Sequence, residues 1–127
     1  MERINISTGS SWEPIVGYSR AVRIGHTIEV SGTTSADADG IKFPGDLYSQ
    51  ARYCIEKILK ALASCGAGKE HVIRTRMYVT DISKWEVVAK AHAEFFSEIR
   101  PATTMVEVSR LIDPALLVEI EASAVVG

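Results

Sequence analysis

The amino-acid sequence predicts an α+β domain, in which a mixed β-sheet is covered on one side by two helices. Two long segments carry apolar residues at the 3.6-residue spacing of a helix, and shorter segments around them alternate with the two-residue period of a strand. The chain of 127 residues is 46% hydrophobic and 24% charged, which is typical of a globular domain and excludes a disordered chain. No repeat or linker divides it, so residues 1–127 are predicted to form a single domain.

The first quarter of the chain is predicted to be a turn-rich, tied-down arm followed by a β-hairpin. Residues before position 20 are polar and rich in turn-forming types, which favours a tied-down arm. Residues 21–24 and 27–31 have the pattern of two short strands joined by a tight turn at Gly25-His26. The segment 35–45 concentrates Asp, Gly and Pro, and we expect it to form a surface loop.

A helix of about five turns is predicted to follow Asp46. Asp46 has the side chain of an N-cap, and Gly66 tolerates the left-handed conformation that often ends a helix. Both cysteines, Cys54 and Cys65, fall on this helix about 16 Å apart, against the ~6 Å that a disulfide requires. We therefore expect two free thiols. The apolar face of the helix comprises Tyr48, Ala51, Ile55, Ile58 and Leu62.

A strand and a second helix come next. Residues 71–80 alternate, so that Ile73, Met77 and Val79 share one face while Arg74, Arg76 and Tyr78 share the other. Ser83 and Glu86 have the spacing of a capping box, which predicts that the second helix begins at Ser83 and ends before Pro101. Its expected apolar face comprises Trp85, Val88, Ala91, Phe95 and Ile99.

Two strands, at about 102–110 and 116–125, are expected to end the chain. Alternation places Glu119, Glu121 and Ser123 on one face of the last strand. If the two strands pair antiparallel, Glu107 lies opposite Glu119, and such facing acids need nearby cations. Arg74 and Arg76 would supply them in an acid–arginine network on the helix-free face.

This network has two interpretations. An exposed charged face commonly needs no special function, so the network can be structural or belong to a subunit interface. Alternatively, Glu119 is partly desolvated in a cleft, where it positions water or a proton for a small ligand. Two further residues also have two interpretations each. His92 is either a packing histidine or a ligand contact, and Tyr18 either packs the arm or presents its hydroxyl to a cleft.

Composition and motifs argue against several classes of function. The net charge is −2 and the basic residues are scattered, which disfavours a nucleic-acid partner. No apolar run is long enough to span a bilayer and no signal peptide is visible, so we expect a cytoplasmic protein without a membrane partner. Nucleotide-binding and G-x-S-x-G motifs are absent, and neither the three histidines nor the cysteines have metal-ligand spacing. We expect neither a metal nor a cofactor.

Short motifs along nearly the whole chain resemble those of the YjgF/RidA family of reactive-intermediate deaminases. They are Gly17-Tyr18-Ser19-Arg20-Ala21, Val30-Ser31-Gly32, Gln50-Ala51, Val79-Thr80-Asp81, Phe95-Phe96, Pro101-Ala102, Val106-Glu107-Val108, Arg110-Leu111 and Val118-Glu119-Ile120-Glu121-Ala122. The resemblance implies a chorismate-mutase-like fold and a homotrimer with a ligand cleft between each pair of subunits. It also implies cofactor-free hydrolysis of a 2-imino acid to a 2-keto acid and ammonia.

Carried over to this sequence, the family's cleft positions fall on Tyr18, Ser31, Gly32 and on Glu119, which the resemblance associates with the water. The family's carboxylate-binding arginine would follow Pro101-Ala102, where this chain has Thr103. An asparagine common in the family's second helix corresponds to Ala89. The resemblance thus indicates a divergent member with two altered cleft positions.

Three functional hypotheses follow from this resemblance. In the first, the trimer hydrolyses a small enamine, imine or related metabolite, with Glu119 handling the water and Tyr18 and Thr103 contacting the substrate. In the second, the same clefts bind a metabolite without turnover. Ribonuclease activity, the third, is disfavoured by the acidic balance and by the absence of a basic aromatic platform.

Overall fold

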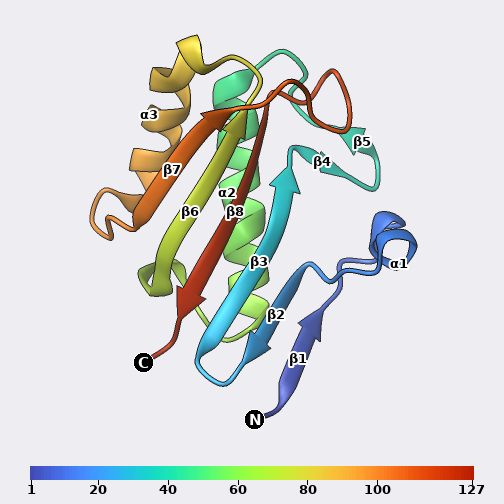
Figure 1. Ribbon diagram of the computed structural model, residues 1–127, viewed down its shortest axis with the longest axis vertical. Coiled ribbons are helices and arrows are strands. Elements are labelled where there is room, and N and C mark those ends of the chain that lie inside the picture. Colours follow the sequence, from blue (N-terminus) through green and yellow to red (C-terminus); the bar gives the residue numbers. More distant parts are fainter.

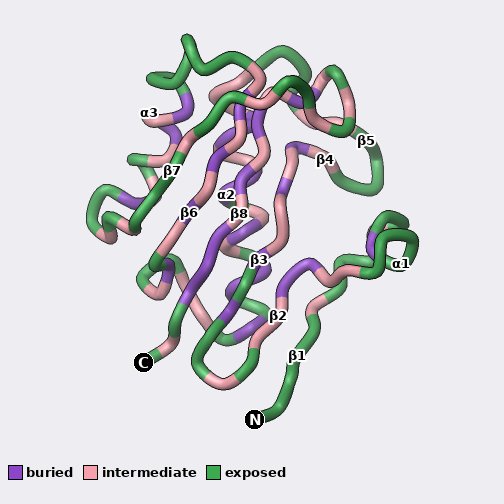
Figure 2. Tube along the Cα trace, in the orientation of Figure 1, coloured by how far each residue is buried: buried purple, intermediate pink, exposed green.

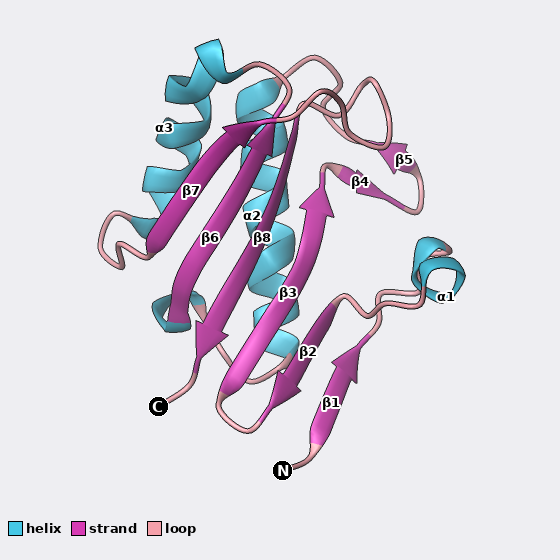
Figure 3. Cartoon of the chain, viewed as in Figure 1, coloured by secondary structure: helices cyan, strands magenta, loops and turns pink.

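The computed structural model describes all 127 residues and consists of two long helices packed on one face of a six-stranded sheet (Figures 1 and 3). The sheet contains β1 (Arg3–Ile6), β2 (Ala21–Ile24), β3 (Thr27–Thr34), β6 (Val72–Val79), β7 (Ala102–Glu107) and β8 (Val118–Val125). The helices are α1 (Trp12–Val16), α2 (Leu47–Ser64) and α3 (Trp85–Phe96), with single 3₁₀ turns η1 (Lys69–His71) and η2 (Ile82–Lys84). A small hairpin of β4 (Ala36–Asp37) and β5 (Gly40–Ile41) lies in the segment expected to be a loop. The predicted α+β class with two helices on one face is confirmed.

The last strand in the chain lies in the middle of the sheet. The strand order is β1-β2-β3-β8-β6-β7, and every neighbouring pair is antiparallel except β6–β7, which is parallel. A parallel pair needs a crossover connection, which α3 provides. The expected antiparallel pairing of the last two strands is therefore wrong, since Glu107 lies opposite Val79 while Glu119 lies between Thr34 and Tyr78.

The N-terminal segment is more ordered than its composition predicts. β1 pairs antiparallel with β2 at the edge of the sheet, and α1 ends at Gly17, whose φ of 88° is left-handed. Buried Glu13 accepts hydrogen bonds from the hydroxyls of Ser7 and Thr8, at 2.8 and 2.6 Å. The arm is tied down as predicted, but β1 and α1 within it were not predicted, because the pairing of β1 with β2 is a tertiary contact that outweighs weak local propensities. These contacts fix the position of the backbone just before Tyr18.

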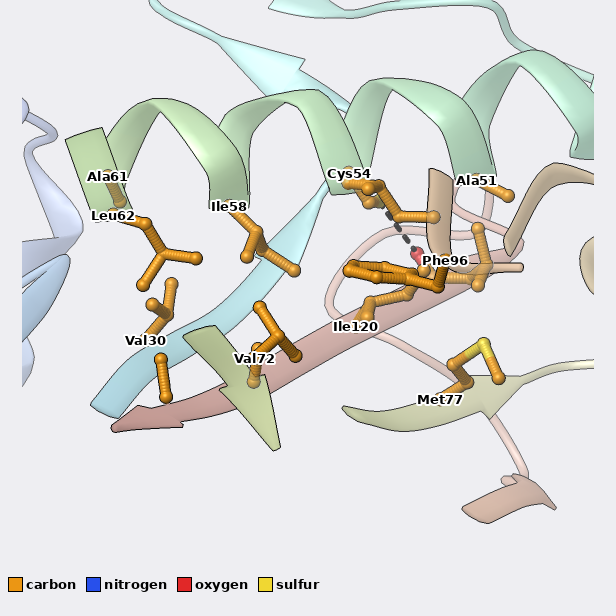
Figure 4. Packing of buried hydrophobic residues seen from close by; sticks show 14 of the residues in the cluster. Val30, Ala51, Cys54, Ile58, Ala61, Leu62, Val72, Met77, Phe96 and Ile120 are labelled. Carbon is orange, nitrogen blue, oxygen red and sulfur yellow. Dashed lines mark hydrogen bonds between the residues drawn. The ribbon is translucent and has the colours of Figure 1, made fainter. Parts of the chain in front are cut away.

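The helix α2 forms as expected and supplies one wall of the core. The carboxylate of Asp46 accepts a hydrogen bond from the Ser49 backbone N–H at 3.0 Å, and Gly66 adopts a φ of 80° just beyond the C-terminus. Figure 4 shows Ile58 and Leu62 directed from α2 toward the sheet residues Val30, Val72 and Ile120. None of the helices is both long and apolar enough to cross a membrane.

Both cysteines are free, as predicted. The thiol of Cys54 points into this core and lies 3.9 Å from the carbonyl oxygen of Val118 (Figure 4). Burial raises the pKa of Cys54 to about 12, so this thiol stays protonated.

Two details of the middle of the chain differ from the prediction. A β-bulge between Val72 and Arg74 turns Val72 into the core and leaves Ile73 52% exposed. The expected capping box at Ser83 is absent, because Asp81 accepts a hydrogen bond from the Ser83 N–H and the chain makes η2 before α3 begins at Trp85. Phe96 is buried, whereas the predicted Phe95 and Ile99 are half-buried against the core. Trp85 is 51% exposed, so it is not part of the core.

Burial differs strongly across the sheet (Figure 2). The central strands β6 and β8 alternate buried and half-buried residues, whereas the edge strand β7 is largely exposed on both faces. On β8, Val118, Ile120 and Ala122 face the helices, and Glu119 and Glu121 face away from them. The predicted division of this strand into an apolar and an acidic face is confirmed.

Gln50 joins α2 to two loops that the hydrophobic core does not reach. Its fully buried amide donates to the carbonyl oxygens of Phe43 and Ala115 at 3.1 and 2.9 Å and accepts from the Leu117 N–H at 2.9 Å. These bonds position the chain directly before β8. Replacing the amide with an apolar side chain leaves those backbone groups without a partner.

We predict that Gln50→Leu lowers the free energy of unfolding by about 3 kcal/mol, because several buried backbone groups lose their hydrogen bonds. Urea denaturation followed by circular dichroism measures this. Lys60→Leu, on the exposed side of the same helix, is the control and should change the value by less than about 0.5 kcal/mol. Equal effects of the two substitutions would contradict the role given to Gln50.

Candidate functional site

Glu119 lies against the backbone of Gly32 on the helix-free face of the sheet. The pairing of β3 with β8 shifts register between Val30 and Thr33, and Gly32 lies within this irregularity. A Cβ atom on Gly32 would overlap the Oε2 atom of Glu119, so only glycine leaves room for the carboxylate in this position. The β-bulge and the glycine together give Glu119 its half-buried place.

A buried arginine adjoins this pair. Arg20 is only 8% exposed, and its Nη2 donates to the carbonyl oxygen of Gly32 at 2.6 Å, while its Nε has no partner. The guanidinium carbon lies 5.9 Å from the centroid of the Tyr18 ring. The hydroxyl of Ser31 donates to the Ser19 carbonyl oxygen at 2.7 Å. The structure thus brings together four of the predicted site residues, Tyr18, Ser31, Gly32 and Glu119.

The electrostatic surroundings of Glu119 favour its protonated form. Burial raises its pKa, and the neighbouring charge of Glu121 raises it further, whereas Arg20 acts in the opposite direction. Glu121 itself accepts a 2.6 Å hydrogen bond from the hydroxyl of Tyr78, which raises the pKa of Tyr78. A half-buried carboxyl group with a raised pKa is suited to exchange protons with water or a ligand.

A second group of predicted residues lies on the helix-covered side of the sheet. Thr103, on the exposed edge strand β7, has its Oγ1 2.7 Å from that of Thr75 on β6. The same Thr75 oxygen lies 2.9 Å from Nε2 of His92 on α3. Ala89 precedes His92 by one turn of α3. His92 is half-buried, and this burial lowers its pKa and favours the neutral imidazole.

These two groups do not meet within one chain. Thr103 and Glu119 are separated by two strand spacings, about 10 Å, and by about 10 Å along the strands, and they face opposite sides of the sheet. The predicted site residues therefore form a Glu119 cluster (Tyr18, Arg20, Ser31, Gly32 and Glu119) and a Thr103 cluster (Thr75, Ala89, His92 and Thr103).

The predicted acid–arginine network is not formed within the chain. Arg76 lies beside Glu121 in register, yet neither Arg74 nor Arg76 makes an ion pair, and Arg74 donates to the hydroxyl of Thr104 at 2.7 Å. The ion pairs of the protein lie on other surfaces, between Lys42 and Asp37, Arg52 and Glu56, and Arg52 and Glu94. The helix-free face therefore carries Arg74, Arg76, Glu119 and Glu121 without an ion pair between them in a single chain.

Neither cluster resembles a metal centre. No three His, Cys, Asp or Glu side chains lie together in an arrangement that could hold a metal ion. A surface hollow of about 130 Å³ between Phe43, Arg52 and Glu56 contains none of the predicted site residues. The chemistry available to this chain is thus that of a carboxyl group, hydroxyl groups, an imidazole and a buried guanidinium.

Two members of these clusters were not identified from the sequence. Thr75 is 1% exposed and interrupts the apolar face of its strand, a pattern that marks a buried hydroxyl needing a partner. Arg20 precedes a strand in a polar segment, where local pattern carries no sign of burial. Its position depends on contacts with Gly32, twelve residues further along the chain.

We predict that Glu119 titrates above the ordinary range of a glutamate and that Glu121→Gln lowers its pKa, because one of the charges that raise it is removed. Carbon-13 NMR of the side-chain carboxyls measures both values.

Because the raised pKa of Glu119 lets the folded state bind more protons than the unfolded chain, the wild-type protein loses stability as pH rises from the unfolded to the folded pKa of Glu119. Glu119→Gln should lack this loss, and a titration of Glu119 below pH 4 would contradict the assigned environment.

The fold and the Glu119 cluster define a class of small α+β proteins, in which a helix-backed mixed sheet carries a half-buried glutamate over a glycine. Comparison with known proteins identifies the class. Residues 8–126 match the family model described as endoribonuclease L-PSP. A Streptomyces coelicolor protein, SCO2049, is 37% identical over 96% of this chain and 91% of its own length, and it is described as uncharacterized.

Solved structures agree with this result. Rv2704 of Mycobacterium tuberculosis, a member of the YjgF/YER057c/UK114 family, is 50% identical, with a TM-score of 0.90 over 98% of this chain and 100% of that one. Escherichia coli TdcF, solved with bound serine, is 26% identical, with a TM-score of 0.79 over 87% of this chain and 88% of its own. The chain belongs to the YjgF/YER057c/UK114 family, and the chorismate-mutase-like fold expected from the resemblance is confirmed.

Proposed function

We propose that this protein is a homotrimer that binds a small metabolite in clefts between its subunits and hydrolyses an enamine or imine there without a cofactor. The observation that carries the proposal is the separation of the site residues into two clusters on opposite faces of one chain. A cleft between two subunits allows the Glu119 cluster of one to face the Thr103 cluster of the next.

The exposed surfaces of the chain support an assembly of this kind. The edge strand β7 is largely exposed, and Val106 on its helix-free face is 41% exposed. Arg74, Arg76 and Glu121 share that face without ion pairs. Charges and apolar groups exposed side by side at a sheet edge are suited to complementary partners on another subunit.

The proposed chemistry follows from the environment of Glu119. In its ionised form the carboxylate accepts a proton from a water molecule, whose oxygen then bonds to the carbon of the C=N group. The nitrogen takes up a proton, and the resulting carbinolamine releases ammonia and leaves a carbonyl product. The overall change is addition of one water and loss of one ammonia, so no cofactor is required. Tyr18 and Ser31 line the water side of the cleft.

The other side of the proposed cleft sets the substrate. The family resemblance implies an arginine that clamps a carboxylate, whereas Thr103 offers a short neutral hydroxyl. Ala89 likewise lacks the amide of the family's asparagine. We therefore propose a neutral or differently oriented ligand, and inefficient hydrolysis of 2-imino acids. The alternatives are an ordinary 2-iminobutanoate or 2-iminopropanoate deaminase and a non-catalytic metabolite-binding trimer.

Two comparisons bear on the choice of ligand class. The structure of Escherichia coli TdcF holds bound serine, a small polar metabolite, and this supports a metabolite cleft in the present chain. The family model carries the description endoribonuclease. The acids Glu29, Glu119 and Glu121 on the helix-free face disfavour the phosphate backbone of RNA there.

We predict a particle three times the mass of the 13.8 kDa chain, because the site is incomplete without a neighbouring subunit. Size-exclusion chromatography with light scattering at micromolar concentration measures this. A measured mass equal to that of a single chain would show that the proposed cleft between subunits does not form.

We predict that Glu119→Ala abolishes turnover or ligand binding while the trimer persists, because the carboxyl group that handles water is lost. Glu121→Ala is the matched control, since it removes an acid from the same face that is already bound by Tyr78. Glu121→Ala should retain activity within about threefold, because Glu121 affects the reaction only by raising the pKa of Glu119. Equal effects of the two substitutions would assign both acids a structural role.

We predict that the wild-type protein hydrolyses 2-iminobutanoate poorly, because a charge-assisted hydrogen bond of roughly 1.5 to 3 kcal/mol, equivalent to about ten- to more than a hundredfold in affinity, is missing. Thr103→Arg should introduce carboxylate binding, with Thr103→Ser as the control for a changed side chain. The imine is generated in situ by a threonine dehydratase and trapped with semicarbazide, and suppression of trapping is measured. Suppression by the wild type equal to that of an arginine-bearing relative would restore the ordinary deaminase assignment.

A further inference from the structure

Thr103, Thr75 and His92 form a continuous line of hydrogen-bonding atoms from an exposed strand to a helix. The Thr103 and Thr75 hydroxyl oxygens are 2.7 Å apart, and the Thr75 oxygen is 2.9 Å from Nε2 of His92. Both separations are those of good hydrogen bonds. Thr103 lies at the exposed end, and His92 packs against Phe96 with ring centroids 4.7 Å apart.

The middle member restricts how these bonds can run. Thr75 is 1% exposed, and its hydroxyl has no partners other than Thr103 and His92. A hydroxyl carries one proton and two lone pairs, and if Thr75 accepted from both neighbours its own buried proton would have no partner, which is costly. Thr75 therefore donates to one neighbour and accepts from the other. If Thr75 donates to His92, Thr103 donates to Thr75 and presents only lone pairs outward. If His92 donates to Thr75, Thr75 donates to Thr103, and Thr103 is free to donate outward.

His92 decides between these two directions. A neutral imidazole can carry its proton on either nitrogen, whereas an imidazolium carries protons on both and can only donate. Nε2 is the ring nitrogen that faces Thr75, and Nδ1 makes no hydrogen bond within the chain. Protonation of His92 therefore fixes the second direction.

We propose that His92 and Thr75 are positioning residues that set which hydrogen bond Thr103 offers to the ligand. The proposal rests on the proposed function, in which Thr103 faces the cleft. With Nε2 unprotonated, Thr103 binds a donor such as an amine or ammonium group. With a proton on Nε2, Thr103 binds an acceptor such as a keto oxygen. Specificity between the amino and keto forms of one metabolite would thus depend on His92.

The charged groups around His92 leave it free to respond to pH in this way. Burial is the cause of its lowered pKa, and no charged neighbour contributes. On α2 and α3, Arg52 is bound to Glu94. On β6 and β7, Arg74 donates to Thr104 on the opposite face, and Glu107 accepts from the Ile82 N–H. At the end of α3, Arg100 donates to the carbonyl oxygen of Ser97.

A matched pair of probes tests the proposal. 2-Butanone and 2-butylamine share one carbon skeleton without a carboxylate and differ in a keto oxygen against an ammonium group, and neither changes its ionisation between pH 5 and 7.5. Their dissociation constants are measured by NMR titration of the full-length protein, both as wild type and with Glu119→Gln, which keeps a side chain of the same shape beside Gly32, unlike Glu119→Ala, and removes the titration of the carboxyl. We expect the preference for the keto probe to rise about two- to tenfold as pH falls from 7.5 to 5, as one gained hydrogen bond predicts.

The matched variants are Thr75→Val, which keeps the shape and removes the hydroxyl, and Thr75→Ser, which keeps the hydroxyl. Thr75→Val should make the keto-to-amino preference independent of pH, and Thr75→Ser should restore the dependence. A structural role of Thr75 alone would change both affinities together and leave their pH-dependent ratio intact. Persistence of the full pH dependence in Thr75→Val would overturn the proposal.

A measurement without ligand tests the hydrogen-bonded line Thr103–Thr75–His92 independently of the proposed function. Thr103→Val should shift the nitrogen-15 resonances of the His92 ring, although the two residues share no hydrogen bond, while Thr104→Val on the opposite face should not. Thr75→Val should lower the pKa of His92 further, because the imidazolium loses its acceptor. Unchanged His92 ring resonances in Thr103→Val would overturn the proposed coupling of Thr103 to His92 through Thr75. Intact coupling without binding of either probe would instead reject the metabolite cleft.

Discussion

The pairing of β8 with both β3 and β6 is the constraint on which the rest of the structure depends. This C-terminal strand joins the N-terminal hairpin to the β6-α3-β7 unit, and its apolar face provides the centre of the core beneath α2. The same strand carries Glu119 on the opposite face, beside Gly32 on one neighbour and Tyr78 on the other. Sheet, core and candidate site therefore share a single element, whose register is held by alternation of apolar and acidic residues.

Polar groups at the core boundary position the two clusters. Gln50 fixes the chain just before β8, Arg20 binds the carbonyl oxygen of Gly32, and Thr75 joins β7 to α3 through His92. Each is buried or nearly so, and burial makes a polar contact expensive to lose. The resulting clusters are each held by hydrogen bonds but lie apart, on opposite faces of the sheet. We infer from this that a neighbouring subunit completes the site.

The elements with strong local signals were predictable from the sequence. α2 has a long apolar stripe, an aspartate cap and a terminal glycine, and the hairpin of β2 and β3 has its tight turn. Errors arose where long-range pairing decides the outcome. β8 lies between β3 and β6 instead of beside β7, and β1 needs β2 as a partner. The capping box at Ser83 failed because Asp81 supplies the competing cap. Burial of Arg20 and the hydrogen bonds of Thr103 depend on tertiary contacts that no local pattern reports.

The central claim is that the Glu119 cluster of one subunit and the Thr103 cluster of the next form one cleft. A crystal structure of the assembled protein measures this directly, through the distance from each Glu119 carboxylate to Thr103 of the partner subunit. We expect the two groups to face each other across a cleft wide enough for a small metabolite. An assembly in which they lie on separate surfaces, or in which either is covered by an apolar contact, would contradict this claim.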